Sequence, residues 1–454
     1  MFELQPKFGK FPVIGLRTDY SVRPATELQV YRAARAKLTL SVMNSGLRRR
    51  LARAWFLFPA YLITEILVPW LRFSGPACTA FGHPRSRQFL EVARLSLNDG
   101  PCGRKGYYNG GLAVHRGGPE LESYVHDQLH ECLIQFCRFS VGRLFGRQSN
   151  LGNKQTLAGE CKRAGLPHIA TFARVAPDGT ISFEVEGGRE TLEHEASIFV
   201  KPAKGSQGRH ADRWDRIGGA YTNSAGVRVE DLDLLLQHIH GQAMAIGGEL
   251  LIQETLRNIP DIQDYGSRAL STVRLVTLRS ADGVVRPVQA FMRIGTQPDA
   301  AVDNYHAEGV CFDVDYRTGT IGTGLALDFS LNPVALHTTP AAAGALTGSV
   351  VPSWRDLSAL GVDAHRKLTL DTVCGWDIAV TNKGPVIVEC NAVPSMDVPC
   401  QRWLGGFFGS EYSHLLRQEI LTFLDRLEPE GSRFRFQHHQ TGGREIDIGL
   451  DHTG

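Results

Sequence analysis

No Cys-X-X-Cys pair occurs in this chain of 454 residues, although it contains nine cysteines. Cysteines at that spacing build structural zinc sites, so we expect no site of that kind. The amino terminus also lacks the charged start, apolar core and small-residue cleavage site that together direct secretion. Scattered cysteines and the missing signal favour a reducing, cytoplasmic setting.

Neither sign of charge is in excess, because 49 Lys and Arg residues oppose 47 Asp and Glu residues for a formal net charge of +2. Without a global field, no nucleic-acid partner is predicted and any ligand must be recognised by local groups. The GxxxxGK[ST] loop and the strand-GxGxxG-helix unit are both missing, which disfavours P-loop and Rossmann sites. No GxSxG elbow or HExxH helix offers a nucleophile or a zinc site.

Long hydrophobic runs are scarce, and one alone could concern a membrane: WFLFPAYLITEILVPWLRF, from Trp55 to Phe73. Glu65 lies in its middle and Pro59 and Pro69 interrupt it, so a spanning helix is disfavoured. We expect a buried helix. A peripheral contact with anionic lipid is the alternative, because a basic run precedes the segment, at Arg48, Arg49, Arg50 and Arg53.

The pattern of apolar and polar residues changes along the chain. Residues 1–149 carry apolar positions at three- and four-residue spacing, which indicates a mainly helical front region. From residue 150 short β-rich runs alternate with a few helical segments, which is typical of an α+β fold. From residue 428 to 454 the chain is polar and irregular, and it reads as a loose tail.

Near the carboxyl end, GWDIAVTNKGPVIVECN predicts a β-hairpin with one acid in each strand. A three-residue loop centred on Lys383, with Gly384 in the left-handed conformation, would place Thr381 opposite Pro385 and Ala379 opposite Ile387. Asp377 then faces Glu389, and Asn391 lies on the same face because side chains alternate along a strand. The opposite face would be apolar and buried, formed by Ile378, Val380, Val386 and Val388.

Two carboxylates opposite one another in a sheet repel at a Cβ separation of about 5 Å, so a positive group should lie between them. Carboxylate and amide oxygens suit Mg²⁺, which usually completes its coordination with waters and phosphates. Asp377, Glu389 and Asn391 are therefore candidate metal ligands. A solvated polar face, or acids neutralised by arginines, is the structural alternative.

Upstream segments offer groups that could bind phosphate. FVKPAKGSQGR places Lys201 at the end of a strand and before a glycine loop, whose backbone N–H groups can approach an anion closely. Gln253 and Glu254 end the apolar strand LLIQE, where they could meet an adenine edge. Arg274 and Arg293 are embedded in apolar strands and need anionic partners, which triphosphate oxygens or the acids above would supply.

The order of these parts, beginning with Lys154 in LGNKQTL, resembles the ATP-grasp superfamily. In particular it is similar to the sugar-transfer-associated ATP-grasp family, which is found with polysaccharide biosynthesis. The residues that carry this closer match are LSTVRLVTL, FMRIG, Asp303-Asn304, VDYRTG, VPSW and GWDIAVTNKGPVIVECN. The resemblance covers roughly Gln88 to Leu416.

The resemblance implies an α+β ATP-grasp fold, with two subdomains, residues 150–252 and 253–427, that grip ATP. It assigns a role to each matching position, and Arg274 and Arg293 would stabilise the transferring phosphoryl group. Asp377, Glu389 and Asn391 would hold Mg²⁺. The nucleotide itself would be bound by Lys154, Lys201, Lys204, Gly205, Ser206, Gly208, Gln253, Glu254 and, at the ribose, Asp261.

Such a site activates a carboxylate as an acyl phosphate, which an amine then captures. We therefore predict an ATP-dependent carboxylate–amine ligase with small-molecule carboxylate and amine substrates, in the family's setting linked to sugars or cell-surface polymers. A kinase on the same fold, with Asp303 or His306 as base, is the first alternative. A nucleotide-binding module without catalysis is the second.

Overall fold

The computed structural model describes residues 30–31, 34, 59–99, 107–108, 112–114, 123–125, 127–146, 149–203, 210–223, 225–263, 269–295, 309–327, 333–336, 346–396, 401 and 404–427. The predicted glycine loop at residues 204–209 lies outside this part, as do Asp303, His306 and residues 428–454.

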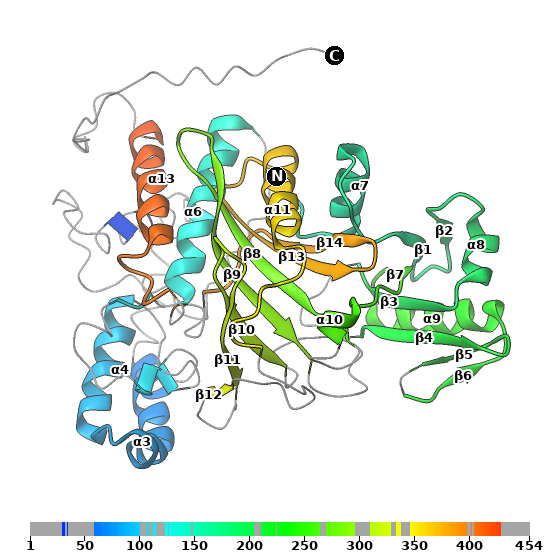
Figure 1. Cartoon of the computed structure of the whole chain (residues 1–454). Helices are drawn as coiled ribbons and strands as arrows, with labels where there is room; N and C mark the ends of the chain where they lie inside the picture. Colours follow the sequence, from blue (N-terminus) through cyan, green and yellow to red (C-terminus); the bar gives the residue numbers. More distant parts are fainter. Residues whose placement is uncertain are drawn as a thin grey trace.

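Helices precede the two sheets, as expected (Figure 1). The π-helical segment η1 (Ile63–Leu67) continues into α3 (Val68–Phe81), and α4 (Arg85–Asp99), the short η3 (Leu112–Val114) and α6 (Asp127–Phe145) follow. Helix α3 ends at Gly82, whose φ of 66° lies in the left-handed region that glycine adopts without strain. The segments η1, α3, α4 and η3 share a small core of their own, which includes Ile66, Ala77 and Val92, whereas α6 packs in another core.

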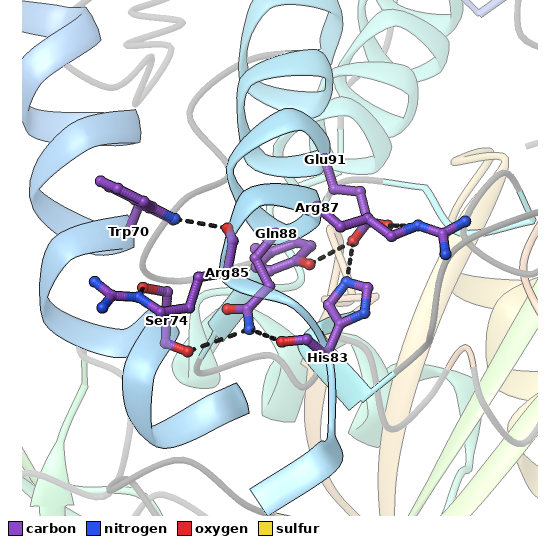
Figure 2. A network of polar contacts seen from close by, with 8 residues as sticks. Trp70, Ser74, His83, Arg85, Arg87, Gln88 and Glu91 are labelled. Carbon is purple, nitrogen blue, oxygen red and sulfur yellow. Dashed lines mark hydrogen bonds and ion pairs between the residues drawn. The ribbon is translucent and has the colours of Figure 1, made fainter. Parts of the chain in front are cut away.

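The turn between α3 and α4 is held by side chains that donate hydrogen bonds to backbone carbonyls (Figure 2). The Trp70 indole donates to the carbonyl of Arg85 at 2.8 Å, and the Gln88 amide donates to the carbonyls of Ser74 and His83 at 3.2 and 2.6 Å. The His83 ring also lies 2.8 Å from the carboxylate of buried Glu91. The inward face of α3 is therefore fixed to α4.

The first sheet is antiparallel, with strand order β2-β1-β7-β3-β4-β5-β6. Helix α9 begins after Asp231, whose side chain accepts from the N–H of Leu234 at 2.8 Å and so satisfies an otherwise unpaired donor. Alternate strand residues such as Ile198 and Val200 pack against the apolar face of α9. The elements are β1 (Thr171–Val175), β2 (Ile181–Phe183), α8 (Gly188–His194), β3 (Ser197–Pro202), β4 (Asp212–Ile217), β5 (Ala220–Asn223), β6 (Arg228–Val229), α9 (Leu232–Ile246) and β7 (Leu250–Glu254).

The second sheet is also antiparallel, with strand order β12-β11-β10-β9-β8-β13-β14. It is buried on both faces: α7 and α11 cover one face, and α6 and α13 cover the other (Figure 1). The elements are α7 (Lys154–Ala164), α10 (Pro260–Gln263), β8 (Thr272–Arg279), β9 (Val285–Ile294), β10 (Val310–Val314), β11 (Ile321–Leu327), β12 (Pro333–Leu336), α11 (Trp354–Leu368), β13 (Val373–Thr381), β14 (Gly384–Asn391) and α13 (Glu411–Leu427).

Both connections to the first sheet dock onto the β13–β14 hairpin. Before β1, the N–H of Ile387 donates to the carbonyl of Pro167 at 3.0 Å, and the N–H of Ile169 donates to the carbonyl of Ile387 at 3.3 Å. After β7, the N–H of Ile259 donates to the carbonyl of Val380 at 3.4 Å. The strands that carry the predicted acids therefore lie where the two sheets join.

The buried helix expected within residues 55–73 is confirmed for one face only, where Tyr61, Ile66 and Pro69 are buried. Ile63, Leu67, Val68 and Leu71 are exposed, with 40–56% of their surface accessible. Within the part of the chain that is described, no helix is long and apolar enough to cross a membrane.

Candidate functional site

The predicted pairing of Asp377 with Glu389 is confirmed, although the route to it differs from expectation. The turn has two residues, because Thr381 pairs with Gly384 and Ala379 pairs with Val386. A bulge then leaves Val388 unpaired and restores Asp377 opposite Glu389. The three-residue loop and the pairs Thr381–Pro385 and Ala379–Ile387 were therefore wrong.

The bulge also changes which side chains are buried behind the acids. Ile387, which the simple alternation placed with the acids, is 1% exposed and packs in the core with Ile378 and Val380. Val388, expected in that core, is half-buried at the bulge. Trp376 and Cys390 face the core as well, so the Cys390 side chain points away from the acids.

Two arginines engage Asp377 directly. The Arg274 guanidinium donates through Nε to Oδ1 and through a terminal nitrogen to Oδ2 at 2.8 Å, and Arg293 contacts Oδ2 at 2.7 Å. Asp377 is 3% exposed and Arg274 9%. Burial would raise the pKa of Asp377, but the two guanidiniums outweigh it and hold that pKa below its ordinary value. Asp377 is thus ionised and neutralised by arginine, as the structural alternative foresaw.

The sheet register explains this cluster. Asp377 on β13 lies directly opposite Arg274 on β8 and opposite Glu389 on β14, so all three occupy one face. Arg293 arrives from β9, where Thr272 is its cross-strand neighbour. The Thr272 hydroxyl accepts from two nitrogens of Arg293 at 2.7 and 3.2 Å, which orients that guanidinium toward Asp377.

Gly375 lies beside this cluster, and the sequence did not single it out as a candidate. A Cβ atom there would lie 2.9 Å from Cβ of Pro394 and 3.0 Å from Cδ of Arg274. The absent side chain leaves room for the aliphatic part of Arg274 on its way to Asp377. A glycine inside a strand often marks such a close approach, and that signal could have identified it.

Lys201, on the first sheet, and Lys154, at the start of α7, are the two predicted lysines that the structure describes. Lys201 on β3 is 9% exposed, and Lys154 begins α7, whose N-cap Asn153 accepts from two backbone N–H groups. Burial, and after it the charge of Lys154, lower the pKa of Lys201 to about 8, although the carboxylates of Glu389 and Asp377 act in the opposite direction. Lys201 is thus within electrostatic range of Lys154, Glu389 and Asp377, which come from segments far apart in sequence.

Gln253 and Glu254 end β7, as expected, but they are engaged differently. The Gln253 amide donates to the Thr171 hydroxyl at 2.9 Å, while its buried Oε1 accepts no hydrogen bond from the described residues. Glu254 accepts from the N–H of Ala170 at 2.9 Å and pairs with Lys383 at 2.5 Å. Glu254 therefore links the first sheet to the hairpin turn, a contact that sequence alone did not suggest.

The remaining predicted residues fall into three sets. Glu389 and Asn391 are half-buried on β14, and the buried amide nitrogen of Asn391 has no hydrogen-bond partner among the described residues. Asp261 is exposed in the first turn of α10 and makes no hydrogen bond or ion pair with any described residue of this cluster. Lys204, Gly205, Ser206 and Gly208 lie outside the described part.

The donor chemistry at β14 fits Mg²⁺. The carboxylate of Glu389 and the amide oxygen of Asn391 lie two residues apart on one face, beside Asp377, and both are oxygen donors of the kind that Mg²⁺ prefers. Across the described ranges, no group of three His, Cys, Asp or Glu side chains gathers as a metal site. Any metal here would therefore rely on Asn391 and on its substrate for further oxygens.

Comparison with known proteins identifies a family. The model of the sugar-transfer associated ATP-grasp family matches residues 146–401. A search of curated proteins found no significant match.

Solved structures with a similar arrangement include D-alanyl-alanine synthetase A from Vibrio cholerae, at 14% identity and a TM-score of 0.36, over 61% of this chain and 66% of that one. The D-alanine-D-alanine ligase from Coxiella burnetii follows at 12% identity and a TM-score of 0.33, over 61% of this chain and 57% of that one. The Bacillus anthracis D-alanine–D-alanine ligase complexed with ATP is 11% identical with a TM-score of 0.32, over 60% of this chain and 65% of that one. The chain thus spans no more than 66% of the length of these three proteins.

Proposed function

Because the match at residues 146–401 covers more than half of its length, the chain belongs to the sugar-transfer associated ATP-grasp family, and we propose that it is an ATP-dependent carboxylate–amine ligase. In the proposed reaction, a substrate carboxylate oxygen attacks the γ-phosphorus of ATP, which releases ADP and forms an acyl phosphate. An amine nitrogen then displaces inorganic phosphate, loses a proton and forms the amide. The proposed substrates belong to sugar or cell-surface polymer modification.

The observation that carries this proposal is the charge of the cluster. Four cations, Lys154, Lys201, Arg274 and Arg293, surround two carboxylates, those of Asp377 and Glu389. With Lys201 protonated at neutral pH, the site has an excess of two positive charges in a largely buried setting. A local excess of positive charge attracts anions, so these residues favour a polyanion. A nucleotide triphosphate has the charge to fill it.

Each side chain has a proposed task. Lys154 and Lys201 bind phosphate oxygens, and Arg274 and Arg293 neutralise charge that develops during phosphoryl transfer while Asp377 holds both guanidiniums in place. The unpaired Oε1 of Gln253 is an acceptor suited to the exocyclic amine of adenine.

The remaining residues of the predicted site also have proposed tasks. Glu389 and Asn391, with Asp377, would hold Mg²⁺, which when bound supplies Lewis-acid stabilisation of phosphate charge. The loop residues Lys204, Gly205, Ser206 and Gly208 would cover the phosphates, and Asp261 would meet the ribose.

The proposal is tested by ³¹P NMR of the full chain with Mg-ATP, a panel of sugar acids and amino acids, and hydroxylamine to trap acyl phosphates. We expect ADP, phosphate and a hydroxamate, and the trapped acid identifies the substrate. Glu389→Gln should abolish the signal, whereas Glu230→Gln, an exposed change on the first sheet, should not. A phosphate ester in place of the hydroxamate would establish the kinase alternative. ATP that binds without turnover under every condition would favour the binding module.

A further inference from the structure

The outward face of the first described helix, residues 59–81, is unusual in composition. Its exposed residues up to residue 80 are Pro59, Ala60, Ile63, Thr64, Leu67, Val68, Leu71, Arg72, Pro76, Thr79 and Ala80. Only Arg72 among them is charged, and none is acidic. A helix on the surface of a globular protein normally turns its polar side to water, so this face is the reverse of the usual pattern.

The large apolar side chains of this face form one stripe. Ile63, Leu67 and Leu71 recur every four residues and are 50%, 40% and 56% exposed, and Val68 beside them is 48% exposed. The other side of the helix is occupied: Trp70 and Ser74 contact Arg85 and Gln88 of α4 (Figure 2). The outward stripe is therefore not the packing face of the front helices.

Charge in the sequence that contains and flanks this helix is strongly one-sided. Between Leu28 and Leu90 the chain has ten Lys and Arg residues and a single acid, Glu65, although the whole chain is nearly balanced at 49 to 47. Glu65 is half-buried and so does not face outward with the stripe. Arg72 follows Leu71 at the edge of the stripe and lies over the Phe73 ring at 5.4 Å.

From the apolar stripe and this charge asymmetry we propose that Ile63, Leu67, Val68, Leu71 and Arg72 form a docking surface for a membrane with anionic lipid. The apolar side chains enter the boundary between headgroups and acyl chains with the helix parallel to the membrane plane, and the basic residues remain among lipid phosphates. A protein partner would have to provide an acidic surface of matching apolar shape. A lipid bilayer provides both features over any area. The surface is independent of the ligase chemistry proposed above.

The test is cosedimentation of the full chain with vesicles of phosphatidylcholine alone and of equimolar phosphatidylcholine and phosphatidylglycerol. We expect binding to the anionic vesicles, weakened by added salt because surface attraction is screened. Leu67→Asp/Leu71→Asp should lower the partition coefficient at least about tenfold, since two charges replace apolar contacts with the membrane. The matched control is Ile217→Asp/Met244→Asp, two apolar residues of the first subdomain that are 63% and 59% exposed. It should bind like the unchanged protein.

Folding is checked by comparing circular dichroism melting curves of all three proteins, and oligomeric state is checked by light scattering. Absence of binding to anionic vesicles by the unchanged chain overturns the proposal. So does equal loss in the control variant, or full binding by Leu67→Asp/Leu71→Asp. A dimer that this variant converts to a monomer, with no vesicle binding by either, would make the surface an interface between copies of the chain.

Discussion

Asp377 and Glu389 lie side by side on neighbouring strands, yet their surroundings predict losses of stability of very different size when each is replaced. Asp377 is 3% exposed and bound by two arginines, so Asp377→Asn keeps the shape but leaves Arg274 and Arg293 facing an uncharged amide. Removing one partner of a buried ion pair typically costs about 3–5 kcal/mol. Glu389 is half-buried and makes no hydrogen bond or ion pair with described residues, so Glu389→Gln should cost less than about 1 kcal/mol.

Native-state hydrogen exchange can measure this difference where it arises, at the amides of β8 and β13, on protein free of nucleotide and treated with EDTA. At about 1.4 kcal/mol per tenfold, Asp377→Asn should reduce protection by about a hundredfold or more. Glu389→Gln should change it by less than about tenfold. Comparable losses in the two variants, or little loss in Asp377→Asn, would refute the assignment of Asp377 as the anchor of both guanidiniums.

The ion pairs of Asp377 also predict how stability depends on pH. The folded state lowers the pKa of Asp377, so its ion pairs stabilise the fold at any pH above the unfolded-state pKa near 3.8, and this stabilisation is lost as pH falls through the lower folded-state pKa. The decrease in protection of β13 at acid pH should therefore be smaller in Asp377→Asn than in the unchanged protein.

Further predictions concern residues around this pair. Gly375→Ala places a methyl group 3.0 Å from Cδ of Arg274, so turnover should fall as the guanidinium shifts, with a stability loss of about 1–3 kcal/mol; unchanged kcat would exclude the steric role. Burial gives Lys201 a pKa of about 8, so nucleotide affinity measured by calorimetry should fall as pH rises through that value, and Lys201→Arg should remove the dependence. Lys383→Gln breaks the ion pair with Glu254 between the two sheets, and we expect faster hydrogen exchange at residues 166–170 with β8 unaffected. Unchanged exchange there would show that the backbone contacts alone hold the junction.

Much of the hairpin could be predicted because its information is local. Alternation of apolar and polar residues marks both strands, and Asn382-Lys383-Gly384 marks the turn, with Gly384 at a φ of 93°. The pairing of Asp377 with Glu389 was right because two errors compensated: the loop is one residue shorter, and the bulge at Val388 adds one residue. A bulge has no distinct local signature, so the faces of Ile387 and Val388 could not be predicted.

The ion-pair partners of the arginines and of Glu254 could not be predicted in the same way. Arg274 and Arg293 need anions wherever they are buried, and the sequence offered both phosphate and the acids as partners. The strand order and pairing of the second sheet make Asp377 the partner, because β13 lies between β8 and β14 and places Asp377 within reach of both arginines. Glu254 likewise was expected at a ligand, whereas the docking of β7 beside the hairpin turn brings Lys383 to it.

Local residue patterns were enough to predict the strands, the hairpin and the kinds of charge that the site contains, since strand alternation and turn chemistry act between near neighbours. The long-range packing of the chain set the surroundings of Lys201, bound Asp377 to two arginines, and turned the stripe at Ile63, Leu67 and Leu71 outward. These outcomes depend on which surfaces of distant segments are buried against one another. That choice is made by packing of the whole chain, and no local pattern encodes it.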